Sequence, residues 1–174
     1  MTDDLTREDV FLNYVVGTMV TSLKFRKAFV NILEEVGLCL EHFIGNELKK
    51  EKYFSLVGIG KKIAATENKV KKLKSQLIDF QQAYLLLESP KSLCGLHNAT
   101  TRILSRLVDA ADGFHSFFGN PLDEFYGFHY LKQGWSNLEV FEAEYSIIRE
   151  VLRDLLDPVT FKENFENIQN LSIL

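Results

Sequence analysis

Two interleaved series of residues, each repeating every seven positions, run between residues 63 and 87. The first series is Ile63, Val70, Leu77 and Tyr84, and the second is Thr66, Leu73, Phe80 and Leu87. Alternating steps of three and four place these mostly apolar side chains on one face of a helix, as in a coiled coil or a long bundle helix. The proline at position 90 ends the pattern, because the residue before a proline avoids the helical conformation. Additional leucines at 85–87 widen the apolar face, which predicts that this end of the helix is the most deeply buried.

A second strongly apolar stretch lies near the start of the chain, between Val10 and Leu23. Thr6 precedes this stretch as the expected N-cap, and acidic residues follow in the first turn. The stretch carries no charge and is apolar on most sides of a helix, which is typical of a helix buried all round. Apolar residues continue at steps of three and four as far as Phe43. The pattern leaves open whether residues 7–50 form one helix or two.

The second half of the chain shows helical spacing broken by residues that often end helices. Residues 103–111 have helical spacing, and Asp112-Gly113 is an expected helix end. Asn120-Pro121 is typical of a helix start, because asparagine caps well and proline is favoured at the first helical position. The helix that begins there is expected to end at Gly134.

A capping box and a final short helix are predicted near the C-terminal end. Ser136 and Glu139 have the spacing of a capping box, in which each side chain binds a free backbone amide of the first turn. The helix expected from there carries apolar residues at steps of three and four through Leu155. Asp157-Pro158 then ends it and begins a short helix around Phe161 and Phe165.

These patterns predict an all-α fold: an antiparallel helical bundle of four main long helices plus one or two short helices. The chain has 174 residues, of which 46% are hydrophobic and only three are prolines. A chain of this length can bury one sizeable core without disulfides or metals. We therefore expect a single helical-bundle domain over residues 1–174.

Surplus apolar surface predicts that the protein associates with other chains. Every helix of a four-helix bundle is peripheral, so the apolar helix over residues 10–23 needs cover on its outer side. The short helix around Phe161 is one source of cover, and a second copy of the chain is another. We favour a non-enzymatic protein that acts through association, either as a two-fold homodimer or as a subunit that binds a protein partner.

Aromatic residues are densest between Phe114 and Trp135, and they give an alternative function. Eight aromatic side chains in this segment exceed what one helix face can bury. They either seal one end of the core or line a pocket for a small ligand or cofactor, in a bundle that could then be an enzyme. The residues proposed for such a pocket are Phe118, Tyr126, His129 and Trp135.

Lysines gather in one part of an otherwise acidic chain. The formal net charge is −4, yet nine lysines and only three glutamates lie between Glu47 and Lys74. A third possible function is therefore binding to an anionic surface, lipid or nucleic acid, through Lys61, Lys62, Lys69 and Lys72. We do not expect nucleic-acid binding, because the overall charge is acidic and no aromatic residues stand between the lysines to stack on bases. We favour the interpretation that these lysines form a solvated helix face. Contact with a membrane surface is possible but is the weaker interpretation.

No set of residues in the sequence has the spacing of a catalytic or metal site. The Glu-x-x-His motifs of di-iron bundles are absent from the sequence, as is a nucleophile elbow. Asp109, Asp112 and His115 are spaced by three and would share one face of a continuous helix. Because Gly113 is expected to break that helix, we predict neither catalytic residues nor a bound metal or cofactor.

The two cysteines and the chain's first residues favour a reducing compartment. Cys39 and Cys94 have no zinc-site spacing, and the first residues are acidic rather than basic as in a secretory signal. The longest uncharged stretch, Val10 to Leu23, is shorter than the roughly 20 residues that a membrane-spanning helix needs. We therefore expect a cytoplasmic protein.

Overall fold

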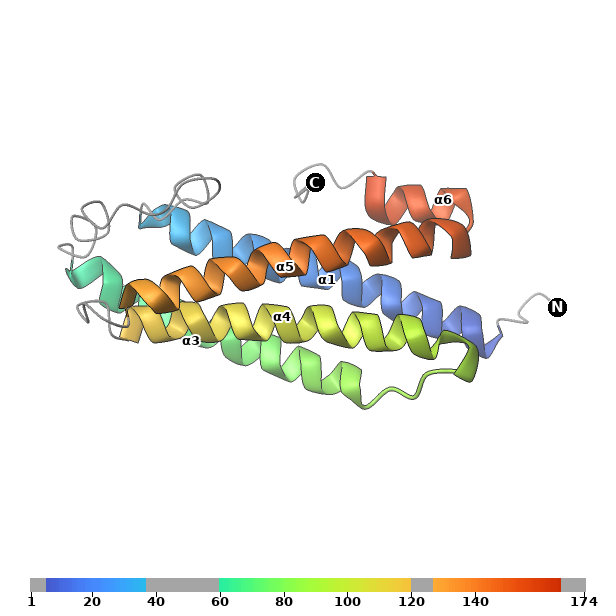
Figure 1. Cartoon of the computed structure of the whole chain (residues 1–174), viewed down its shortest axis with the longest axis horizontal. Coiled ribbons are helices and arrows are strands. Elements are labelled where there is room, and N and C mark those ends of the chain that lie inside the picture. The colour runs from blue at the N-terminus through green and yellow to red at the C-terminus, as the bar shows by residue number, and fades with distance from the viewer. Residues whose placement is uncertain (1–5, 37–59, 120–126, 167–174) are drawn as a thin grey trace.

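The computed structural model describes residues 6–36, 60–119 and 127–166, and they form a bundle of long helices (Figure 1). The long helices are α1 (Arg7–Glu35), α3 (Gly60–Leu85), α4 (Cys94–Gly119) and α5 (Gly127–Leu155). A single 3₁₀ turn, η2 (Lys91–Leu93), precedes α4. The short α6 (Pro158–Phe161) continues into a π-helical turn, η3 (Lys162–Glu166). The predicted all-α bundle of four main helices with a short one is confirmed.

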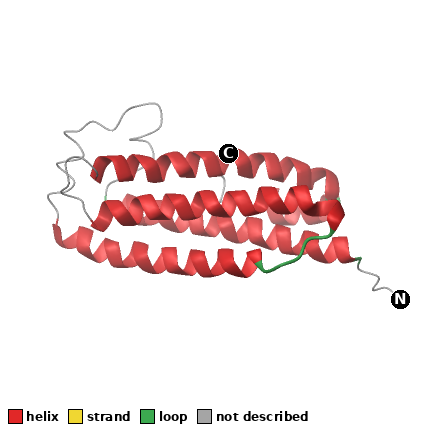
Figure 2. Cartoon of the chain, turned by 60° about the horizontal axis from the view of Figure 1, so that its bottom comes forward, coloured by secondary structure: helices red, strands yellow, loops and turns green. Residues whose placement is uncertain are grey.

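Successive long helices run in opposite directions, so the bundle is antiparallel (Figures 1 and 2). Helix α4 packs along both α5 and α3, and α1 contacts α3 and α4. The α6–η3 segment folds back beside the end of α5, where η3 reaches α1. The core contains residues from all four long helices, among them Met19, Phe29, Leu33, Leu77, Ile103, Leu107, Phe114, Leu138, Phe141 and Leu152.

Helix α1 begins where the sequence predicts. The Asp9 amide donates to Thr6 Oγ1 over 3.1 Å, and the Thr6 amide donates to Asp9 Oδ2 over 3.2 Å, which completes a capping box. Within the single chain, however, the helix is not buried on every side. Val15 and Met19 are fully buried, whereas Val10 is 41% and Tyr14 52% exposed. One apolar edge of α1 therefore remains at the surface.

The heptad face of α3 is confirmed over the part whose side chains are described, from residue 65 onward. Thr66, Val70, Leu77 and Tyr84 are buried, and Leu73, Phe80 and Leu87 are half-buried. The side chain of Ile63 lies outside the described residues. The prediction that the 84–87 end is the most deeply buried is wrong, because Leu85 and Leu86 are exposed. The helix ends at Leu85, and these two residues lie outside its buried face.

Helices α4 and α5 both run through glycines that the sequence suggested as helix ends. α4 continues past Gly113 to Gly119, and α5 passes Gly134 without a break. A Cβ on Gly113 would lie 2.7 Å from the Gly134 backbone nitrogen, and a Cβ on Gly134 would lie 2.5 Å from the Phe114 ring. These glycines therefore serve the close approach of two helices rather than ending either one.

The predicted capping box at Ser136 is also wrong, because this residue lies exposed inside α5. The predicted start at Asn120-Pro121 falls outside the described residues. The end of α5 follows the prediction: Asp157 caps α6, accepting a hydrogen bond from the Thr160 amide over 3.0 Å. Phe161 is buried, as expected for a short helix that covers part of the bundle.

Candidate association surfaces

The residues proposed for an aromatic pocket lie in different surroundings. Phe118 and Trp135 are each only 2% exposed and belong to the hydrophobic core. The Trp135 ring meets the Phe114 ring edge-on, with centroids 5.6 Å apart. His129 is exposed, and Tyr126 lies outside the described residues. Two of the four proposed pocket residues are thus part of the hydrophobic core. Ligand binding in this segment stays a prediction.

The lysines proposed for anion binding are only partly described. Lys69 Nζ lies 3.1 Å from Glu35 Oε2 of α1, with both side chains exposed. Lys72 is exposed, and the side chains of Lys61 and Lys62 lie outside the described residues. Anion binding by this group also stays a prediction, and Lys69 already has an acidic neighbour.

The unbroken α4 brings Asp112 and His115 onto one face, beside Lys74 of α3. Lys74 Nζ lies 2.7 Å from Asp112 Oδ1 and 3.4 Å from His115 Nδ1. The ammonium group thus takes the position that a metal cation would need between these side chains. Within the described residues no three histidine, cysteine or acidic side chains are grouped as metal ligands. The geometry is that of an ion pair between helices.

A partly buried polar pair supports the end of the bundle where α3 connects to α4. The Tyr84 hydroxyl lies 3.1 Å from His97 Nδ1, and the two rings are 5.1 Å apart. Burial raises the pKa of Tyr84 to about 12, so the phenol stays protonated well into the alkaline range. The His97 ring also meets Phe11 of α1 edge-on at 5.4 Å. These contacts hold α1, α3 and α4 together at this end.

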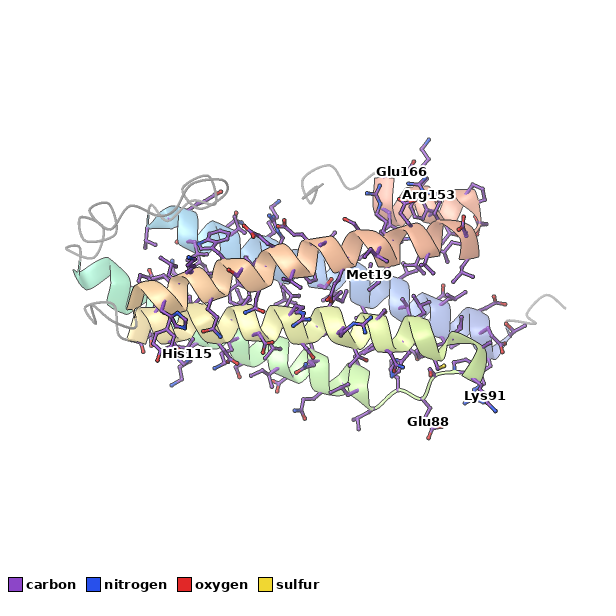
Figure 3. The ribbon with its side chains drawn as sticks, viewed as in Figure 1. Met19, Glu88, Lys91, His115, Arg153 and Glu166 are labelled. Carbon is purple, nitrogen blue, oxygen red and sulfur yellow. The ribbon has the colours of Figure 1, made fainter. Side chains whose placement is uncertain are left out.

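An apolar hollow of about 220 Å³ lies on top of this support. Four of its residues come from one face of α1 at helical spacing, and three come from the α3–α4 connection: Arg7, Val10, Phe11, Tyr14, Leu87, Glu88 and Pro90. The connection is fixed by backbone hydrogen bonds, in which the Leu87 amide donates to the Tyr84 carbonyl over 3.0 Å. Figure 3 marks the connection by Glu88 and Lys91. The hollow is therefore built on ordered backbone.

Leu86 comes directly before Leu87, which lines the hollow, and is 84% exposed, the highest value among the exposed large apolar residues of the described chain. Its amide donates to the Ala83 carbonyl over 3.3 Å, so its backbone is held by the last turn of α3. Val10 and Tyr14 are exposed on the α1 side of the hollow. We call the hollow together with Leu86 the end surface. It combines a protruding leucine with an apolar recess of suitable size.

A second apolar surface runs along the outer side of α5. Val140, Ile147, Val151 and Leu155 are exposed, with Ile147 the most exposed at 66%. Their spacing of seven, four and four residues places them on one helix face, which we call the α5 stripe. A shallow hollow lies around its middle, lined by Ser146, Ile147, Glu150, Val151 and Asp154.

The far end of α5 is tied to the α6–η3 segment by Arg153. Its guanidinium lies 4.5 Å from the centroid of the Phe161 ring, within the range of a cation–π contact. It also forms ion pairs with Glu150 at 3.2 Å and with Glu166 at 3.4 Å. Figure 3 labels Arg153 and Glu166. These contacts hold Phe161 over the bundle on a side of α5 that leaves the α5 stripe open.

The sequence indicates the apolar edge of α1 but neither the exposure of Leu86 nor the α5 stripe, although each of these leaves a signal. The α5 stripe has helical spacing, but α5 also carries the apolar residues of its core face, and the two faces overlap in sequence. Leu86 looked like part of a wide buried face, and only the end of α3 at Leu85 shows otherwise.

Among the described helices none has the length and apolar character to cross a membrane.

Comparison with known proteins found no matching family model, no matching curated protein and no matching solved structure.

Proposed function

We propose that this chain is a non-enzymatic helical-bundle protein that acts through association, and that it pairs with a second copy through the end surface. The observation that carries the proposal is the nearly fully exposed Leu86 beside an apolar recess of about 220 Å³. Burying one leucine side chain contributes roughly 1.5–3 kcal/mol. In the single chain the leucine and the apolar walls of the recess both face water, so that stabilisation is not gained.

A two-fold axis that passes between Leu86 and the hollow allows a second copy to cover both of them. Rotation about such an axis places Leu86 of one copy in the hollow of the other, and the reverse contact forms by symmetry. Val10 and Tyr14 then meet the partner around each leucine, which covers the exposed edge of α1. The interface is closed, so it gives a dimer and not a filament.

The test is the mass of the protein by light scattering across a tenfold dilution in the micromolar range. We expect twice the chain mass of 20.0 kDa for the natural sequence, and the single-chain mass for Leu86→Asp. Because Leu86 is exposed, the substitution should leave the folded monomer as stable as before. Unchanged helical circular dichroism would verify that the variant folds.

Ile147→Asp is the matched control, since it places the same charge on an exposed apolar residue outside the end surface. We expect this variant to keep the dimer mass. If the natural sequence stays at 20.0 kDa throughout, the dimer is rejected. If Leu86→Asp remains a dimer, association stands but the end surface is the wrong interface.

A further inference from the structure

We infer that the α5 stripe is the docking site for a basic amphipathic helix of a partner protein. The stripe extends over sixteen residues of regular helix, from Val140 to Leu155, and the distance between its ends along the axis is about 22 Å, or four turns. Amphipathic helices bind such surfaces through apolar anchors at helical spacing. Ile147 and Val151 line the hollow at its middle, and they are the natural contacts for those anchors.

Acidic side chains beside the stripe select the charge of the partner. Glu139, Glu150 and Asp154 are exposed on α5, and Glu150 and Asp154 line the central hollow themselves. Because Glu150 is paired with Arg153, Glu139 and Asp154 carry most of the charge available to a partner. Residues 139–166 contain eight acidic and three basic side chains. Lysine or arginine at the edges of a docked helix would lie close to these carboxylates, whereas acidic residues there would be repelled.

The same charges argue against the other occupants of this face. A second copy that docked stripe to stripe would bring additional carboxylates to an acidic surface, with like-charge repulsion. An anionic membrane would be repelled for the same reason. The chain's own short helix α6 does not cover the stripe, and its residue Val159 is itself exposed. A partner helix with an apolar face and basic edges would bury the apolar side chains of the stripe and pair with the carboxylates beside it.

The probe for this site is a fluorescent peptide of about 14 residues, four turns of helix, that contains only leucine and lysine at amphipathic spacing. A peptide with glutamate in place of lysine is its matched partner. Fluorescence anisotropy with the full chain should show the lysine peptide binding at least about tenfold more tightly than the glutamate peptide, with an affinity that falls as salt is added.

Two variants of the chain separate the apolar from the charged contribution. Ile147→Gln with Val151→Gln should weaken binding of the lysine peptide about tenfold or more, because both central anchors lose their contact. Glu139→Gln with Asp154→Asn should weaken it about two- to fivefold and flatten the salt dependence. Neither of these two acids takes part in an ion pair within the described residues, so the change leaves the fold's own salt bridges intact. Leu86→Gln, which removes an exposed apolar side chain elsewhere, should change the affinity less than twofold.

Three results would overturn the inference. Equal binding of the lysine and glutamate peptides would show that the carboxylates do not select the partner. An unchanged affinity in the Ile147→Gln, Val151→Gln variant would place the peptide elsewhere. A loss of dimer mass in that same variant would mean that a second copy covers the stripe. The first two results leave the dimer through the end surface untouched, and the mass of Leu86→Asp tests that dimer independently.

Discussion

Tyr84 shows how one side chain serves both the fold and the end surface. It occupies a predicted seam position of α3, and its hydroxyl pairs with His97, whose ring supports Phe11 at the base of the hollow. Desolvation is the main reason that its pKa rises to about 12. The sequence predicted its burial from the heptad spacing. It could not predict the pairing with His97, because that contact depends on how α3 and α4 align.

The raised pKa gives a prediction for alkaline pH. The folded protein holds the Tyr84 proton more tightly than the unfolded chain, whose tyrosine has a pKa of 10.0. The unfolded chain therefore binds fewer protons between pH 10 and 12, and stability falls as the pH rises through that window. Below pH 10 the contribution is constant. We expect Tyr84 to account for a loss of about 1–3 kcal/mol by pH 12.

Urea unfolding at pH 8, 10 and 11.5 measures this dependence. Tyr84→Phe should lose less stability with rising pH than the natural sequence does. Its remaining decline includes Tyr145, whose pKa burial also raises. Equal slopes for Tyr84→Phe and the natural sequence would contradict the burial of this phenol.

At the scale of elements, the contact between α4 and α5 depends on Gly113 and Gly134. A Cβ on Gly113 would meet backbone atoms on α5, the Gly134 nitrogen at 2.7 Å and the Tyr130 oxygen at 2.8 Å. Backbone atoms can make room only if the two helices separate. We therefore expect Gly113→Ala to destabilise the protein by about 1–3 kcal/mol, as overpacking of a core does.

Gly17→Ala is the matched control for that prediction. Gly17 lies inside α1, and an added Cβ there would have no neighbour within 4 Å. Alanine at this position should raise the stability by about 0.5–1 kcal/mol, because it restricts the unfolded chain. Urea unfolding of both variants gives the comparison. A Gly113→Ala variant as stable as Gly17→Ala would show that α4 and α5 do not approach as described.

The sequence predicted elements well where the signal was local and periodic. The heptad face of α3, the Thr6 cap and the Asp157-Pro158 break all depend on residues within a turn or two of each other. The errors at Gly113 and Gly134 have the opposite origin. A glycine that ends a helix and a glycine that admits a neighbouring helix look alike in sequence, and only the tertiary contact distinguishes them.

The candidate surfaces were harder to predict than the helices. Surplus apolar area near Val10 was visible in the sequence, and the exposed edge of α1 lies there. Leu86 and the α5 stripe depend on where α3 ends and on which face of α5 meets α4. Both are properties of the assembled bundle. The aromatic segment drew attention by its density, yet the described rings of Phe114, Phe118 and Trp135 are core.

For the whole molecule, self-association and partner binding are assigned to two separate surfaces. The end surface lies where α1 begins and α3 joins α4, whereas the α5 stripe follows the outer side of a different helix (Figure 1). The two surfaces have no residue in common, so we expect a dimer formed through the end surface to leave both stripes open. Such a dimer would present two docking faces for basic helices, and we expect one peptide bound per chain.

The most direct test of the end surface is cross-linking between two differently tagged variants, made in a chain whose natural cysteines are replaced by serine. One variant carries Leu86→Cys and the other carries Tyr14→Cys. In the proposed dimer these side chains face each other across the interface, so a short bismaleimide should join the two tags efficiently. Pairing Leu86→Cys with Ile147→Cys should give only background joining. Equal yields from the two mixtures would contradict a dimer in which Leu86 enters the partner's hollow.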